Sequence, residues 1–159
     1  MNNKEEKYAE NLIKKSSNFI DKAEKELEKT YPLISNVITF CQQSMELSAK
    51  ALFKLMGIDF PKKHEIKFER EETKRLLKEL LDKDFPKSFY EKDKIPRLFF
   101  LTQFWEKFYT LSKYGIDKLN IGPDYLFEKE EAKLALKHAN ECYKISSGLE
   151  NAIRVLKLL

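Results

Sequence analysis

The chain has 159 residues, of which 35% are charged, and its formal net charge is only +4. This charge is too small and too dispersed to mark a nucleic-acid-binding surface by itself. Four glycines and five prolines leave little material for turns, so the composition favours a few long helices in one domain, residues 1–159. Because no run approaches eighteen apolar residues and the N-terminus lacks the apolar stretch of a signal peptide, we expect a soluble, cytoplasmic protein that does not enter a membrane.

The first two predicted helices cover residues 4–29 and 32–56, and Pro32 separates them. The first is apolar on one face, whereas the second is apolar on two, so we expect the second at the centre of a bundle or at an oligomer interface. One clearly polar stripe remains on the second helix, formed by Asn36, Gln43, Glu46, Lys50 and Lys54.

Three further helices are predicted over residues 70–83, 96–114 and 128–158. The helix over 96–114 is rich in phenylalanine, which favours core packing over a base-stacking surface, since stacking on nucleic acid would need interleaved basic residues. Alternating spacings of four and three predict a seam on the last helix, formed by Ala135, Ala139, Cys142, Ser146, Leu149, Ile153 and Leu156. The predicted fold class is therefore all-α, an antiparallel up-and-down bundle of four long helices plus one short helix.

Residues that could hold a metal ion or a nucleophile are few. His64 and His138 are the two histidines, and no spacing with Cys41 or Cys142 assembles a metal site. A glycine-rich phosphate loop is also missing from the sequence, so we expect no metal and no cofactor. His138 follows Lys133 and Lys137 on the last predicted helix and is interpreted as a solvated or edge histidine, whereas His64 is interpreted as a loop histidine.

Residues 41–66, CQQSMELSAKALFKLMGIDFPKKHEI, carry a recognisable pattern. The pattern consists of paired glutamines, a glutamate, Lys-Ala-Leu, a glycine, a proline and a histidine, here Gln42, Gln43, Glu46, Lys50, Ala51, Leu52, Gly57, Pro61 and His64. This stretch resembles the core motif of the HEPN family of small prokaryotic helical proteins. Two weaker similarities are Lys113-Tyr114-Gly115, where the family often has Arg-Tyr-Gly, and the EEAKLALKHANE segment of the last predicted helix.

The resemblance implies an antiparallel helical bundle, commonly a homodimer, that in many cases acts with a minimal nucleotidyltransferase as a toxin–antitoxin or regulatory pair. Some members are metal-independent ribonucleases that use an arginine followed by a histidine after four to six residues. None of the four arginines here has a histidine at that distance, and the nearest equivalent is Lys133 before His138. A lysine lacks the forked guanidinium that holds a phosphate at two points.

The leading hypothesis is a non-enzymatic binding and interaction module, a homodimer that acts with a nucleotidyltransferase or binds a nucleotide. Its candidate ligand-binding or partner-binding residues are Gln43, Glu46, Lys50, His64, Lys113 and Tyr114. A simpler alternative for the stripe is that Glu46 and Lys50 form a surface ion pair. Two alternatives for the whole chain are a degenerate ribonuclease that cleaves RNA with Lys133 and His138, and a purely structural helical dimer without a ligand.

Overall fold

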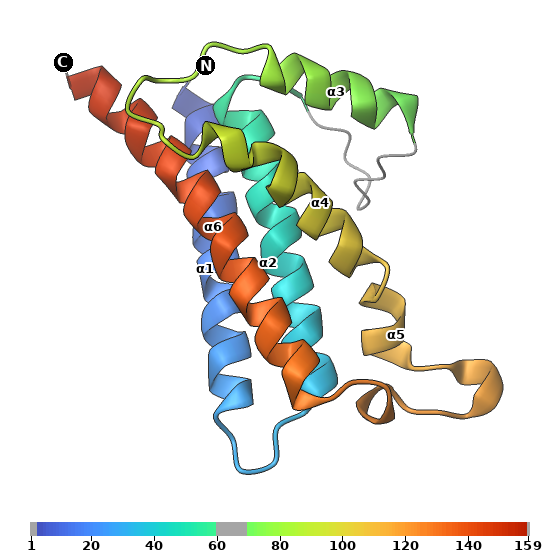
Figure 1. Ribbon diagram of the computed structural model, residues 1–159. Coiled ribbons are helices and arrows are strands. Elements are labelled where there is room, and N and C mark those ends of the chain that lie inside the picture. The colour runs from blue at the N-terminus through green and yellow to red at the C-terminus, as the bar shows by residue number, and fades with distance from the viewer. Residues whose placement is uncertain (1–2, 60–69, 159) are drawn as a thin grey trace.

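The computed structural model describes residues 3–59 and 70–158, which contain helices and connecting loops (Figure 1). The α-helices of this part of the chain are α1 (Asn3–Leu27), α2 (Ile34–Leu55), α3 (Glu71–Leu81), α4 (Ile95–Glu106), α5 (Tyr109–Tyr114) and α6 (Lys129–Leu158). Three short 3-10 helices accompany them, η1 (Lys92–Lys94), η2 (Asp117–Leu119) and η3 (Pro123–Tyr125). The predicted all-α fold class is confirmed.

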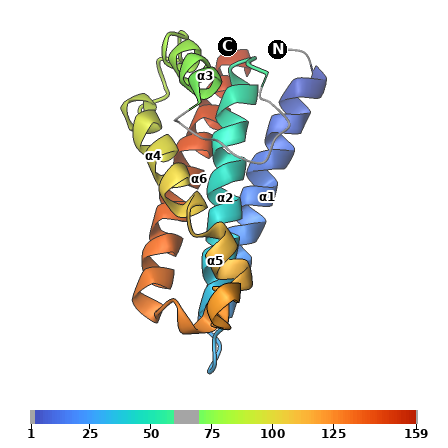
Figure 2. The same cartoon turned by 90° about the vertical axis from the view of Figure 1, so that its right-hand side faces the viewer.

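Helix α2 is the central element of the bundle, as its two apolar faces predict. It packs against α1, α6, α4 and α5, and Figures 1 and 2 show α1 and α4 on opposite sides of it. The fully buried side chains of α2 include Ile38, Met45, Leu52 and Phe53. Helix α3 lies across the end of the bundle at which α1 begins and α6 ends (Figure 1). Burial on both sides leaves α2 only a narrow polar stripe, which contains Glu46 and Lys50.

Small residues allow the helices around α2 to approach it closely. At the α1–α2 contact, the buried hydroxyl of Ser16 lies 2.8 Å from the Ser44 hydroxyl and 2.9 Å from the Ser48 hydroxyl. The predicted α6 seam is buried from Ala135 to Leu149, but it becomes exposed at Leu156. The heptad-like pattern therefore continues past the buried part of the seam, although the end of α6 still contacts α1 through the ion pair of Lys157 with Glu6.

The aromatic helix predicted over 96–114 is interrupted, and α4 and α5 are separate helices. The amide N–H of Phe108 donates to the carbonyl of Trp105 at 3.0 Å, a tighter turn than the α-helical one. This turn places α5 beside α2, where the hydroxyls of Ser112 and Thr39 are 2.9 Å apart. No proline or glycine marks residues 107–108, so the sequence contains no local signal for the interruption.

The aromatic side chains of α4 divide between core and surface. Phe99 and Trp105 are buried, as expected, but Phe100 and Phe104 are 58% and 39% exposed. Their rings stack on each other with centroids 6.2 Å apart. The prediction that the aromatic run is core thus holds for one side of α4 and is wrong for the other.

The loop after α5 is fixed by backbone geometry and by one carboxylate. Gly115 adopts φ +70°, and the amide of Ile116 donates to the carbonyl of Ile121 at 2.9 Å. Asp124 then accepts a 2.5 Å hydrogen bond from the Ser35 hydroxyl at the start of α2, where negative charge is favourable. The loop therefore caps the central helix.

We expect Gly115→Ala to destabilise the fold, because a Cβ there would lie 2.1 Å from the Ile121 carbonyl oxygen in a left-handed backbone conformation. The free energy of unfolding should fall by about 2 to 4 kcal/mol in urea titrations. Gly122→Ala in the same loop is the matched control, since its Cβ would meet only the Tyr125 ring at 3.7 Å. Equal losses for both variants would contradict this explanation.

Candidate functional site

Two residues of the polar stripe of α2, Glu46 and Lys50, form an ion pair with each other. Lys50 Nζ and Glu46 Oε1 are 2.5 Å apart, and each side chain is only 17% exposed. The simpler alternative, in which these residues pair with each other, therefore describes their geometry, although the pair is half-buried. A ligand role for Gln43, Glu46 and Lys50 stays a prediction.

Of the two paired glutamines, Gln42 is the one with a buried side-chain amide oxygen that lacks a hydrogen-bond donor in the part of the chain that the structure describes. Gln42 is 3% exposed, and its Oε1 accepts no hydrogen bond from the described residues, while Gln43 is half-buried. A buried amide oxygen without a donor costs about 1 to 3 kcal/mol. The paired glutamines are visible in the sequence, but the choice between them depends on which one faces the core.

The Lys113–Tyr114 segment lies on the surface of α5. Lys113 Nζ donates to the Tyr109 hydroxyl at 3.1 Å and lies over the rings of Tyr109 and Tyr114. The hydrogen bond to Tyr109 is the main reason that the pKa of Lys113 is raised. Tyr114 itself is 63% exposed, so this predicted site is an open cation–aromatic cluster.

The remaining predicted residues do not form one site. His64 lies outside the described residues. Lys133 is exposed on α6, five positions before the half-buried His138. Five residues correspond to a rotation of about 140° around a helix, so these two side chains leave α6 on different sides.

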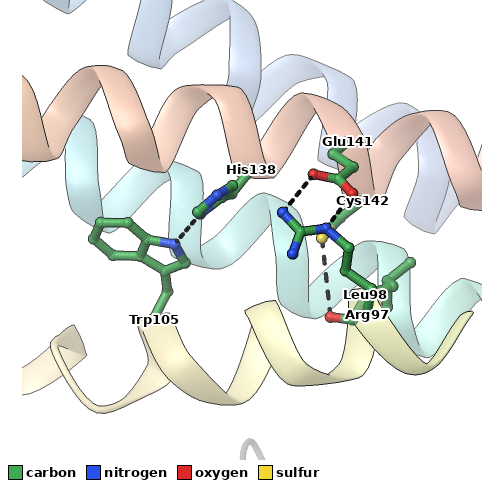
Figure 3. A network of polar contacts seen from close by, with 6 residues as sticks. All are labelled: Arg97, Leu98, Trp105, His138, Glu141 and Cys142. Atoms are coloured by element: carbon green, nitrogen blue, oxygen red, sulfur yellow. Dashed lines mark hydrogen bonds and ion pairs between the residues drawn. The ribbon is translucent and has the colours of Figure 1, made fainter. Parts of the chain in front are cut away.

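His138 instead belongs to a network between α4 and α6, formed by Arg97, Trp105, His138 and Glu141 (Figure 3). The indole Nε1–H of Trp105 donates to His138 Nδ1 at 3.0 Å. Arg97 binds Glu141 at two points, with Nε to Oε1 at 2.5 Å and Nη2 to Oε2 at 3.2 Å. Beside this α4–α6 network, the buried thiol of Cys142 contacts the Leu98 carbonyl oxygen at 3.9 Å.

The Trp105 hydrogen bond determines the tautomer of His138. An indole N–H can only donate, so His138 Nδ1 must be the unprotonated nitrogen, and in the neutral ring Nε2 carries the proton. Burial lowers the pKa of His138, and the positive charges of Arg97 and Lys137 lower it further against the opposing effect of Glu141. His138 is therefore a neutral hydrogen-bond donor at Nε2 near neutral pH.

The network also keeps Glu141 ionised. The hydrogen bonds from Arg97 lower the pKa of the Glu141 carboxyl group, and Lys94 adds a smaller effect in the same direction. The charged side chains that act on His138 are Arg97 and Lys137, which are positive, and Glu141, which is negative. The local charge is net positive.

The domain model of the HEPN family matches residues 9–149. This chain belongs to the HEPN family. HEPN domains are generally modules that bind nucleotides or RNA, or that cleave RNA. No curated protein and no solved structure matches the chain.

Within residues 3–59 and 70–158 of this HEPN chain, no helix is long and apolar enough to cross a membrane. In the same residues, no cluster of three or more histidine, cysteine, aspartate or glutamate side chains could hold a metal ion. The expectation of a protein without metal or cofactor stays a prediction.

Two residues of the α4–α6 network were not indicated by the sequence. Arg97 and Trp105 lie 41 and 33 positions before His138, so their proximity depends on how α4 packs against α6. The one available signal was their spacing: positions 97 and 105 are eight apart, which places them on one face of a helix. Nothing in the sequence assigned α6 as the helix that this face contacts.

The free energy of unfolding should fall as the pH is lowered from about 7 to 5, because the unfolded histidine binds a proton more readily than folded His138 does. The loss begins below the ordinary histidine pKa of 6.5 and ends below the lowered folded pKa. His138→Asn removes this titration while retaining an acceptor at the position of Nδ1. Urea titrations should therefore show a smaller pH dependence for His138→Asn than for the wild type, and an equal one would contradict the burial of neutral His138.

Proposed function

We propose that this HEPN chain is a non-enzymatic binding and interaction module. As a homodimer, it would act with a minimal nucleotidyltransferase or bind a nucleotide, in a toxin–antitoxin or regulatory role in the cytoplasm. The observation that supports this proposal most directly is the state of His138. Its Nδ1 lone pair is occupied by the Trp105 N–H, and its Nε2 carries a proton.

A histidine in this state is poorly suited to RNA cleavage by general base catalysis. A general base must accept the proton of the attacking 2′-hydroxyl through a free nitrogen lone pair. To provide one, His138 would have to release Trp105 or exchange its tautomer. Lys133, at the position nearest to the family's arginine, is exposed on α6 and lacks the forked guanidinium that holds a phosphate at two points.

A degenerate ribonuclease is the second candidate, and one observation favours it. Arg97 on α4 lies close enough to His138 to lower its pKa, so a guanidinium is present beside the histidine although the sequence motif is missing. A guanidinium can stabilise the negative charge that develops during phosphodiester cleavage. In this alternative, the arginine comes from α4 and the histidine from α6.

Purified protein incubated with structured RNA in the presence of a chelator should give no cleavage above that of His138→Ala. The reason is that the wild-type imidazole has no free lone pair to accept a proton. Product formation would be measured on denaturing gels with end-labelled RNA. Cleavage by the wild type that is lost in both His138→Ala and Arg97→Ala would overturn the non-enzymatic proposal in favour of the second candidate.

For the homodimer, we propose an interface that includes the exposed phenylalanines of α4. HEPN domains often dimerise. Phe100 and Phe104 form a stacked apolar pair on the surface, and Leu134 of α6 is also 43% exposed. Contact with a second copy would remove this apolar surface from water.

We expect Phe100→Asp to weaken or abolish the dimer, because it would place a carboxylate in the apolar interface. Sedimentation velocity over a range of protein concentrations would measure the change. Leu119→Asp is the control, since Leu119 is an equally accessible apolar residue, 63% exposed, in the loop after α5. A wild-type monomer, or equal effects of both substitutions, would refute this interface.

A further inference from the structure

We propose that the segment between Phe108 and Phe127 is a flap that opens as a unit while the bundle stays folded, and that its opening uncovers the buried polar side of α2 around Gln42. This α5 flap, residues 109–126, contains α5, η2 and η3. The inference goes beyond the proposed function, because it concerns access to the central helix and does not depend on which partner or ligand the module binds.

The α5 flap contributes little to the apolar core. Between Trp105 of α4 and Ala132 of α6, a stretch that the structure describes throughout, no apolar side chain belongs to the buried core. The buried residues of the flap are Ser112 and Gly115. Segments with few buried apolar contacts open at a lower free energy than the core of the same protein. The α5 flap is therefore at the low-stability end of this fold.

The two ends of the α5 flap are anchored next to each other. Phe108 precedes the flap and Phe127 follows it, and their rings contact each other with centroids 6.2 Å apart. Both rings are partly buried and pack against the core. Figure 1 shows α5 and the loop that follows it at the periphery of the bundle. Because its ends lie close together, the flap can leave α2 without moving α4 or α6.

Hydrogen bonds to one side of α2 hold the α5 flap closed. The Ser112 hydroxyl lies 2.9 Å from the Thr39 hydroxyl, and the Ser35 hydroxyl donates to Asp124 at 2.5 Å. Ser35 and Thr39 are four positions apart, so they lie on the same side of α2. Water can replace these partners when the flap opens, and opening therefore costs less than exposing an apolar core would.

Gln42 favours opening of the flap. It follows Thr39, which contacts α5, by three positions on the same side of α2. Three positions later, the Met45 carbonyl accepts a hydrogen bond from Thr102 of α4, so Gln42 lies opposite the junction of α4 and α5. Its Oε1 is buried without a donor among the described residues, whereas water can donate to it when the flap is open. A partner that donates an N–H or O–H group to Gln42 would therefore bind the open flap and stabilise it.

Native-state hydrogen exchange, measured by NMR without any ligand, tests the opening. The amides of Ser112, Gly115 and Ile116 donate hydrogen bonds within this segment and report on the flap. The amides of Met45 and Leu52, which are buried in α2, report on the core. We expect protection of the flap amides to be lower than that of the core amides by about tenfold or more, with a weaker dependence on urea, because local opening exposes less surface. One common opening free energy and urea dependence for both sets would overturn the flap.

Two substitutions on α2 should change this exchange in opposite directions. Thr39→Val removes the hydroxyl that contacts Ser112 with little change of shape, and it should speed exchange of the flap amides about fivefold, as expected for the loss of one hydrogen bond. Gln42→Met removes the unpartnered oxygen and should slow exchange of the flap amides about threefold, because the closed state then leaves no amide oxygen without a donor at this position.

Two matched controls separate the flap from general effects on α2. Gln43→Met alters the half-buried neighbour of Gln42, and Ser16→Ala removes a buried hydroxyl on the α1 side of α2. Neither should change the exchange of the flap amides relative to that of the core amides. Equal acceleration of flap and core amides by Thr39→Val would refute independent opening. Unchanged or faster flap exchange in Gln42→Met would refute the role of Gln42.

Discussion

Burial of α2 on both faces is the constraint on which the rest of this structure depends. A helix in that position can leave only a narrow polar stripe accessible to solvent. In this stripe, Glu46 and Lys50 form an ion pair with each other. This pairing accounts for the geometry of Glu46 and Lys50, and a ligand role for the stripe stays a prediction. A second set of polar contacts lies farther from the centre, where α4 meets α6 (Figure 3).

The arrangement of the helices was largely predictable because it follows from periodicity. Two apolar faces placed the helix over 32–56 at the centre, and the alternating spacing of four and three predicted the seam of α6, which is buried from Ala135 to Leu149. The interruption of the aromatic helix was not predictable, because residues 107–108 contain no glycine or proline. The interruption accompanies a tertiary contact, between the hydroxyls of Ser112 and Thr39, which no local pattern encodes.

The candidate site was predictable only in part, and for a related reason. His138 is one of two histidines in the sequence. The spacing of the family motif pairs it with Lys133 on the same helix. The structure instead brings Arg97 and Trp105 to the histidine from α4. Sequence motifs describe neighbours along one helix, whereas packing of two helices selects neighbours that are more than thirty positions away.

The single hydrogen bond from Trp105 separates binding chemistry from cleavage chemistry at this histidine. A free imidazole near its pKa can accept and return a proton, which is what general acid–base catalysis requires. An imidazole whose Nδ1 is occupied by an N–H donor, and whose pKa is lowered by burial and by Arg97, keeps only a fixed N–H to offer. The α4–α6 network therefore holds His138 as a hydrogen-bond donor, which supports the proposal of a module that does not cleave RNA.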